Sequence, residues 1–228
     1  MASKRMLPPW MNREIQFGTD YSEEQVLPVM KLPQSCEVIY SHNEKDCSLL
    51  CAELSKSMKL PSVVGFDTEW KPSYTSGREN KIAIVQLCPS LDRCYIFQVS
   101  KMGFIPKPLQ DLVQSSQITK VGMSISSDLW KLYRDYDIDH RFTLSSSLDL
   151  GELAKSLSIL SDKKWGLQSL TKRLFNMDID KSQKIRTGNW EDFPLTCEQL
   201  NYAALDAYAS LFIYEHLQKL KKTMEQKP

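Results

Sequence analysis

The chain has 228 residues, of which 42% are hydrophobic and 25% are charged, and its formal net charge is +1. These values are typical of a globular protein, and the length suits one good-sized α/β domain with a tail. No apolar run approaches the roughly eighteen residues of a membrane span, and the N-terminus lacks the apolar core of a secretory signal. We therefore expect a soluble intracellular protein that has no membrane partner.

The first part of the chain predicts an arm followed by strand, helix and strand. Residues 1–35 mix prolines, methionines and charges without periodicity, so we expect a flexible N-terminal arm. The pattern then becomes regular, with a strand at 37–40, a helix at 46–58 and a strand at 63–70.

The middle of the chain predicts two more strands and then alternation with helices. β-rich runs at 81–88 and 93–100 are separated by turn-forming residues, and they should continue the preceding strand as a meander. A short helix at 109–115, a strand at 118–124 and a helix at 126–136 follow. Serines at the start of the last helix are placed to cap it.

Helices dominate the last third of the chain. We expect them near 150–160, 166–175 and 197–221. The last one opens with Thr196 and, three residues later, Gln199, which is the spacing of a capping box.

These elements predict an α/β fold, with a mixed β-sheet flanked by helices on both faces. We expect one domain over residues 36–221, preceded by the arm and followed by a basic tail at 222–228. The six cysteines and three histidines include no C-x-x-C pair, so a zinc finger is not supported and free, mostly buried thiols are expected.

Two acids at the end of an apolar strand are the first functional signal. In "VVGFDTEW" (63–70) Asp67 and Glu69 lie two residues apart, so a strand points both carboxylates to one side. Two such anions resist joint ionisation unless a cation lies between them or one of them binds a proton. The D-x-E pattern is common, however, and on its own it is more typical of a solvated strand end.

Three further residues strengthen this signal. Asp128 stands at the start of a helix directly after a strand, where it could simply stabilise the positive end of the helix dipole. Asp206 lies among small apolar residues in "NYAALDAYASL", which is not a solvated helix face. Tyr202 is four residues earlier and therefore one turn away on the same face.

Four carboxylates and a phenol suit a site for divalent metal ions. Hard cations such as Mg²⁺ or Mn²⁺ prefer oxygen ligands and would neutralise the Asp67 and Glu69 pair. Two such ions about 4 Å apart can stabilise the attacking and leaving oxygens of a phosphodiester. The residues thus favour a nuclease.

The same residues resemble a known family. "FDTEW", "SSDLWKLYRDYDI" and "YAALDAY" resemble the three motifs of the DEDD exonucleases, in the tyrosine-type branch that includes ribonuclease D and the proofreading domain of DNA polymerase I. The longer phrases, such as "CYIFQVSKM" and "IRTGNWEDFPLTCEQLNYAALDAYASLFIY", are most similar to Werner-type exonuclease domains. The similarity covers roughly residues 36–218, and the arm before it is not explained.

The resemblance implies a ribonuclease H-like fold and 3′→5′ removal of nucleotides as 5′-monophosphates. It implies that Asp67, Glu69 and Asp206 bind two metal ions directly. Asp128 would assist, often through water. The Tyr202 hydroxyl would then orient the attacking water or help to take its proton. Catalytic residues are thus expected at all five positions, and metal ligands at the four acids.

Substrate contacts are expected around these acids. Trp130 would stack on the terminal base or else belong to the core, and Trp70 would pack beside the metal pair. The segment 163–186 holds seven basic residues against two acids, and Arg186 is the expected phosphate contact. The basic residues are Lys163, Lys164, Lys172, Arg173, Lys181, Lys184 and Arg186.

Several alternatives stay open. The Werner-type phrases favour DNA 3′ ends as the substrate and genome maintenance in the nucleus, with a helicase as a partner. RNA, as in ribonuclease D, is a second reading, because sequence does not reveal contacts to the 2′-hydroxyl. A non-catalytic nucleic-acid-binding module is a third, although none of the four acids is replaced. The oligomeric state is not indicated, nor is whether the chain is a short stand-alone protein or an isolated domain.

Overall fold

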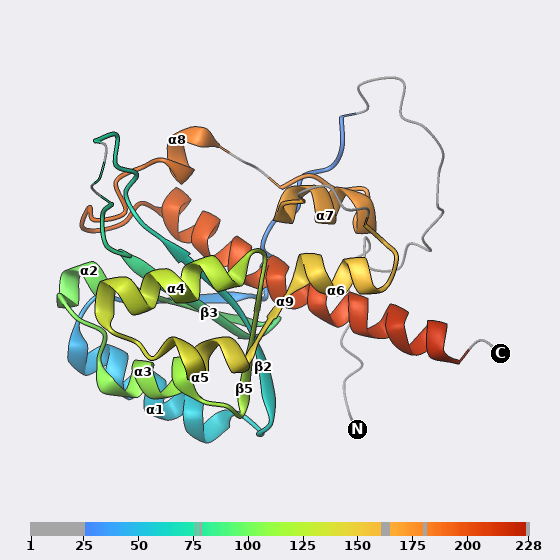
Figure 1. The fold of residues 1–228 in the computed structure, drawn as a ribbon. Coiled ribbons are helices and arrows are strands. Elements are labelled where there is room, and N and C mark those ends of the chain that lie inside the picture. Colours follow the sequence, from blue (N-terminus) through green and yellow to red (C-terminus); the bar gives the residue numbers. More distant parts are fainter. Residues whose placement is uncertain (1–25, 76, 78, 161–164, 180–181, 227–228) are drawn as a thin grey trace.

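A six-stranded mixed sheet forms the centre of the molecule, and helices lie against both of its faces (Figure 1). The computed structural model describes residues 26–75, 77, 79–160, 165–179 and 182–226. The strands are β1 (Glu37–Ser41), β2 (Ser62–Glu69), β3 (Ile84–Ser90), β4 (Arg93–Phe97), β5 (Ile118–Gly122) and β6 (Ser147–Asp149). Their order across the sheet is β1-β4-β3-β2-β5-β6.

The sheet combines a meander with parallel edges. β2, β3 and β4 pair antiparallel in sequence, as expected for a meander. β1 joins β4 in parallel, and β5 and β6 continue the sheet in parallel beyond β2. β2 is therefore an interior strand, and its carboxyl end lies next to the start of β3.

Nine helices are assigned in the described residues. They are α1 (Glu44–Ser57), α2 (Val99–Met102), α3 (Lys107–Gln114), α4 (Ile125–Tyr136), α5 (His140–Ser145), α6 (Leu150–Ser156), α7 (Leu167–Phe175), α8 (Gln183–Arg186) and α9 (Cys197–Glu225). None of these helices has both the length and the apolar character needed to cross a membrane. The short elements α2, α5, α8 and β6 were not predicted, because three to six residues carry too little periodicity.

Two apolar clusters lie on opposite faces of the sheet. Alternate residues of β2 and β3, such as Phe66 and Val85, pack against α1, α3 and α4. The other face of β3, with Ile84 and Cys88, packs against α9. This confirms the expectation of helices on both faces. All six cysteines are free, five of them buried, as the sequence indicated.

The helix starts agree with the sequence in one case and not in another. The Thr196 side chain accepts a hydrogen bond from the backbone N–H of Gln199, and the Gln199 side chain accepts one from the backbone N–H of Thr196, so the capping box of α9 is confirmed. The serine cap expected for α4 is wrong. Ser124 precedes α4 with a left-handed backbone (φ 56°) and makes no side-chain capping bond, whereas a capping side chain normally needs an extended backbone.

The ends of the domain extend beyond the expected boundaries. Met30 is fully buried, and its backbone N–H donates to the carbonyl of Asp178 at 2.7 Å. The Asp178 N–H donates to the carbonyl of Pro28 at 2.8 Å. Part of the expected arm therefore packs on the domain, while residues 1–25 lie outside the described part of the chain. α9 also continues to Glu225, into the expected tail.

α9 lies unusually close to β2. A Cβ atom added at Gly65 would stand 2.0 Å from the backbone oxygen of Ala207, and 3.0 Å from the backbone nitrogen of Leu211. Only a residue without a side chain fits there. The facing helix residues Ala203 and Ala207 are small and fully buried, which lets the backbone approach. The carboxyl half of β2 is thus placed against the first turns of α9.

We predict that Gly65→Ala forces α9 away from β2. Overpacking of this kind should lower the free energy of unfolding by roughly 1–3 kcal/mol, and the variant should also lose the nuclease activity expected from the sequence, because Asp206 moves with the helix. Thermal unfolding and an activity assay measure the two effects. Val63→Ala, which removes atoms two residues earlier in β2, should lower stability but keep activity. Normal activity in Gly65→Ala would show that the close approach is not needed.

Candidate active site

Three carboxylates meet where β2 ends beneath α9. Asp67 and Glu69 point to the same side of β2, and Asp206 approaches from α9. One carboxylate oxygen of each lies within 4.8 Å of the other two. All three side chains are half-buried. The strand period pairs Asp67 with Glu69, and Asp206 of α9 joins this pair. The three residues therefore form one acidic cluster.

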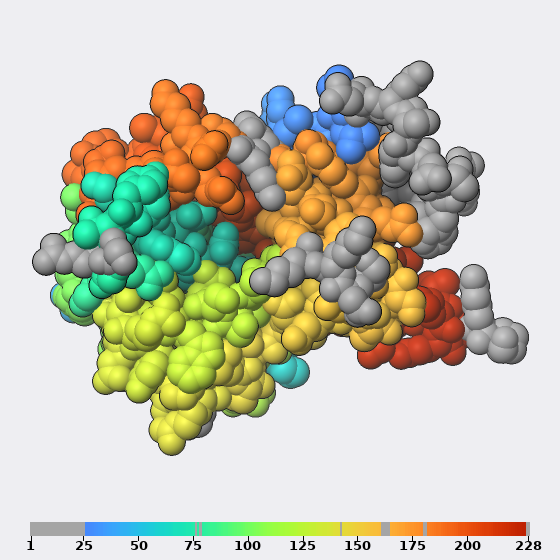
Figure 2. Space-filling model, turned by 45° about the horizontal axis from the view of Figure 1, so that its top comes forward, coloured from blue at the N-terminus to red at the C-terminus, as the bar shows by residue number. Residues whose placement is uncertain are grey.

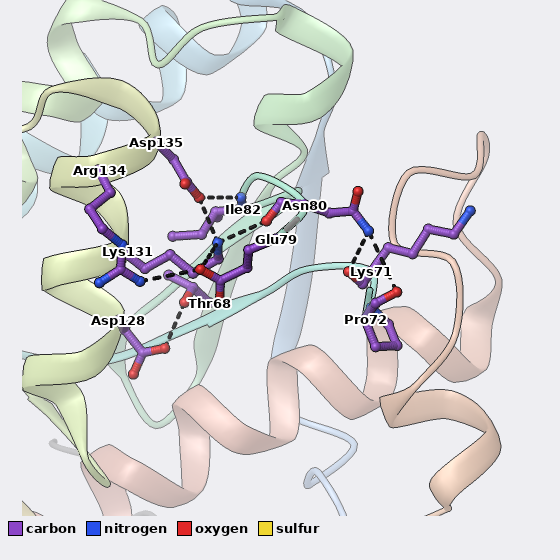
Figure 3. A network of polar contacts seen from close by, with 10 residues as sticks. All are labelled: Thr68, Lys71, Pro72, Glu79, Asn80, Ile82, Asp128, Lys131, Arg134 and Asp135. Carbon is purple, nitrogen blue, oxygen red and sulfur yellow. Dashed lines mark hydrogen bonds and ion pairs between the residues drawn. The ribbon is translucent and has the colours of Figure 1, made fainter. Parts of the chain in front are cut away.

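Asp128 lies beside this cluster rather than in it. It stands in the first turn of α4, and its Oδ1 accepts a hydrogen bond from Thr68 Oγ1 at 2.8 Å (Figure 3). Thr68 is on the face of β2 opposite to Asp67 and Glu69. The structure thus groups three of the four expected metal ligands, and Thr68 orients the fourth. Sequence reasoning missed Thr68.

Burial and mutual repulsion make it costly for all the acids of this cluster to be ionised together. Loss of hydration raises the pKa of Asp67 well above its usual range, and the charges of Asp128 and Asp206 raise it further. Loss of hydration and the same two charges also raise the pKa of Glu69. Burial raises the pKa of Asp128 to about 6, although its bond from Thr68 acts in the opposite direction. Carboxylates this close to one another require protons or cations to neutralise part of their charge.

The residues fit a divalent metal ion. Three grouped carboxylates are hard oxygen donors, which is the ligand set that Mg²⁺ and Mn²⁺ prefer over softer metals. A cation at this position would replace the protons that the raised pKa values indicate. In the described part of the chain, this is the only group of His, Cys, Asp or Glu side chains with such spacing.

Tyr202 stands one turn before Asp206 on α9, with its ring 6.1 Å from that of Trp190. Loss of hydration raises the pKa of its phenol above the ordinary value, and the charges of Asp206 and Glu69 add to this effect. The phenol therefore keeps its proton at neutral pH. A phenol that keeps its proton can donate a hydrogen bond to water beside the acidic cluster.

Arg186, at the end of α8, is a cation close to this site. Its charge lowers the pKa of both Glu69 and Tyr202, which places it near them, and its side chain is exposed. The Trp190 indole N–H donates to the Arg186 carbonyl at 3.2 Å and so supports the end of α8. The expected phosphate contact therefore lies at the rim of the acidic cluster.

The other expected basic residues differ in their surroundings. Lys172 forms an ion pair with Asp178 at 2.9 Å, so its charge is already partnered. Lys184 is exposed on α8, two residues before Arg186. Lys163, Lys164 and Lys181 lie outside the described residues.

The two tryptophans lie in different surroundings. Trp70 packs against the cluster of α1, α3 and α4, with Lys131 Nζ 4.9 Å from its ring centroid. This placement argues for packing rather than for the predicted substrate contact. Trp130 is 40% exposed, and its ring stacks on His140 at 4.3 Å between centroids. It is therefore a surface aromatic and not a core residue.

A buried lysine anchors the segment that follows β2, and sequence reasoning missed it. Lys131 is 1% exposed, and its Nζ contacts Asp135 at 3.0 Å, Glu79 at 3.4 Å and the Asn80 carbonyl at 2.8 Å (Figure 3). Asp135 in turn accepts from the backbone N–H of Ile82 at 2.8 Å. The spacing of Lys131 and Asp135 is visible in the sequence, but it is also typical of an exposed helix pair.

The space-filling view places α9 at the bottom of a hollow (Figure 2). The residues that lead into α9 form one side of this hollow, and the segment between β2 and β3 forms another. The hollow opens to the surface, as a site for the end of a polymer requires.

A sheet of this topology, with carboxylates grouped at the end of an interior strand and on the crossing helix, defines the class of ribonuclease H-like nucleases. Comparison with known proteins supports this class and narrows it. A family model described as 3′-5′ exonuclease matches residues 38–222. The chain belongs to this 3′-5′ exonuclease family, of the DEDD type.

Two relatives show how similar the chain is to other members. The bifunctional 3′-5′ exonuclease/ATP-dependent helicase WRN of Mus musculus is 36% identical over 230 residues, which cover 97% of this chain and 16% of the relative. A 3′-5′ exonuclease of Arabidopsis thaliana is 42% identical over 158 residues, which cover 69% of this chain and 53% of the relative. The chain thus spans about half or less of the length of these relatives.

Solved structures share the fold. The Nibbler EXO domain of Aedes aegypti superposes with a TM-score of 0.69 at 22% identity, over 86% of this chain and 93% of that one. RNase D of Escherichia coli, described as an exoribonuclease involved in structured RNA processing, gives a TM-score of 0.64 at 20% identity, over 85% and 47% of the two chains. The ribonuclease H-like fold expected from the sequence is confirmed.

The raised pKa values predict that metal binding depends on pH. In the metal-free protein Asp67 and Glu69 keep protons that the unfolded chain releases near pH ~4, so stability falls as pH rises through their folded pKa values. A divalent ion must displace these protons, so its affinity should rise roughly tenfold per pH unit for each proton released. The thermal shift between MgCl₂ and EDTA should therefore be larger at about pH 8 than at about pH 5.5. Equal shifts at both pH values would contradict this.

Proposed function

We propose that this chain is a metal-dependent 3′-5′ exonuclease that removes nucleoside 5′-monophosphates from the 3′ ends of DNA. The observation that carries the proposal is the cluster of Asp67, Glu69 and Asp206, which β2 and α9 bring within 4.8 Å of one another, with Tyr202 one turn away. Family membership supplies the direction of cleavage. A non-catalytic binding module would have no need of such a strained group of acids.

Each residue receives a role from its position. Asp67, Glu69 and Asp206 would hold two ions, Mg²⁺ or Mn²⁺, and Asp128 would act from the side through water. When bound, the ions supply activation of water and neutralise the charge that develops on the phosphate. The protonated Tyr202 hydroxyl donates a hydrogen bond that orients the attacking water toward the phosphorus.

The residues at the rim would hold the nucleic acid. Arg186 lies close enough to lower the pKa of Glu69, its side chain is exposed, and its guanidinium group is suited to a bidentate contact with a phosphate. Trp130 presents an exposed ring already stacked on His140, and a base at the end of a strand could extend this stack. Trp70 is half-buried and packs beside Lys131, so we assign it no substrate contact.

DNA is the preferred substrate in this proposal. The Mus musculus exonuclease and helicase matches 97% of this chain, and the matching stretches extend well beyond the acids. RNA is the alternative, which the ribonuclease-like neighbours support only at the level of the fold. By the same likeness we propose a helicase as partner and a role in genome maintenance in the nucleus.

Digestion of a 3′-recessed DNA duplex tests the activity. We expect a ladder that shortens from the 3′ end with Mg²⁺ or Mn²⁺ and disappears with EDTA. Asp206→Asn should abolish the ladder, because it removes one ligand charge while keeping the shape of the side chain. A matched RNA strand should be degraded more slowly. Faster loss of RNA would transfer the proposal to RNA, and cleavage that persists in Asp206→Asn would overturn it.

Tyr202→Phe tests the role of the phenol. The substitution removes the hydroxyl and leaves the ring against Trp190. We expect kcat to fall by roughly 100-fold, the scale of the loss when a reacting group is misplaced by about 1 Å. Mn²⁺ affinity, measured by calorimetry without nucleic acid, should not change, because the three carboxylates remain. Unchanged kcat would remove Tyr202 from the mechanism.

A further inference from the structure

One buried amide next to the acidic cluster has no hydrogen-bond partner. Gln86 of β3 is 0% exposed, and neither Oε1 nor Nε2 of its side chain has a partner among the described residues. The other buried glutamines differ. Gln98 donates to the carbonyls of Trp190 and Asp192, and Gln199 completes the capping box of α9.

The strand register places Gln86 beside Asp67. The two residues are Cα partners across the antiparallel pair of β2 and β3, so their side chains leave the sheet on the same face, with Cβ atoms about 5 Å apart. That face is the one covered by α9, because Ile84 and Cys88 on either side of Gln86 pack there. On the other side of β3 the Cα partner of Gln86 is Ile96 of β4, whose side chain offers no polar atom.

An amide in this position is costly for the fold alone. Buried amides without hydrogen bonds lower stability, and an apolar side chain of the same shape would not incur that cost. The polar group in the cross-strand pair is Asp67, whose carboxylate belongs to the acidic cluster. Carboxylates that hold metal ions are themselves commonly held by hydrogen bonds from a surrounding layer of residues.

We propose that Gln86 is a positioning residue for Asp67, an inference that rests on the proposed metal-dependent function. In the loaded site the Gln86 amide donates a hydrogen bond to the Asp67 carboxylate and limits its rotation, so that its oxygens face the ions. A neutral donor is suited to this task, because it restrains the carboxylate without adding a positive charge that would compete with the metal.

Gln86→Met tests this role, because methionine keeps the length of the side chain and removes the amide. We expect thermal stability in EDTA to stay the same or rise, while Mn²⁺ affinity, measured by calorimetry without nucleic acid, falls roughly 10–100-fold. In the digestion assay kcat should fall and KM for DNA should not change. A merely structural amide would give the opposite pattern, with changed stability and unchanged Mn²⁺ affinity, and that result would overturn the proposal.

His216→Leu is the matched control. Nε2 of His216 is also buried without a hydrogen-bond partner. His216, however, lies ten residues after Asp206 on α9, which corresponds to a separation of about 15 Å along the helix. Its removal should leave Mn²⁺ affinity unchanged, and a loss equal to that of Gln86→Met would count against a specific role. Asp67→Asn should abolish binding. If the unaltered protein binds no Mn²⁺, the proposed function fails; if it binds and Gln86→Met binds equally, only the inference about Gln86 fails.

Discussion

The contact between the backbones of β2 and α9 is the constraint on which the site depends. Gly65 and Ala207 approach so closely that a single added carbon would clash, and the small residues of α9 extend this contact along the strand. Because the contact is made by backbone atoms, the helix cannot slide or tilt without breaking it. Asp206 is thereby held against Asp67 and Glu69 in spite of their mutual repulsion. Apolar packing across the face of the sheet supplies the free energy that opposes this repulsion.

The charges around the cluster set the order in which ligands can enter. Asp67 and Glu69 have raised pKa values, because their surroundings offer too little compensating charge. The nearby buried cation, Lys131, is committed to Asp135 and Glu79. A phosphate that arrives after the acids have lost their protons, but before cations bind, would meet further negative charge, and Arg186 is the cation near the cluster in the described part of the chain that could offset it. Cations must therefore neutralise the acids before the scissile phosphate can settle among them.

Much of the site could be predicted from the sequence, because its residues stand in unsuitable local contexts. Burying acids at the end of an apolar strand or within a small-residue helix costs free energy unless they have a partner. Asp67, Glu69 and Asp206 can therefore be recognised as candidate functional residues from the sequence. The surroundings of Trp70 and Trp130 could not be predicted, since they depend on how α4 rotates against the sheet. The burial of Lys131 could not be predicted for the same reason. Met30 packs through contacts with Asp178, which is distant in sequence and invisible to local patterns.

The site combines rigid and adaptable parts in a way that matches its two ligands. The acids lie on β2, α9 and α4, which are joined by backbone packing and by the bond from Thr68 to Asp128. Metal ions demand ligands held within fractions of an ångström, and long elements of the sheet and its helices provide this precision. Arg186 instead lies on a four-residue helix. In the proposed function Arg186 binds a phosphate of a polymer that moves forward after each cleavage, and a short element lets this contact adjust while the acids stay fixed.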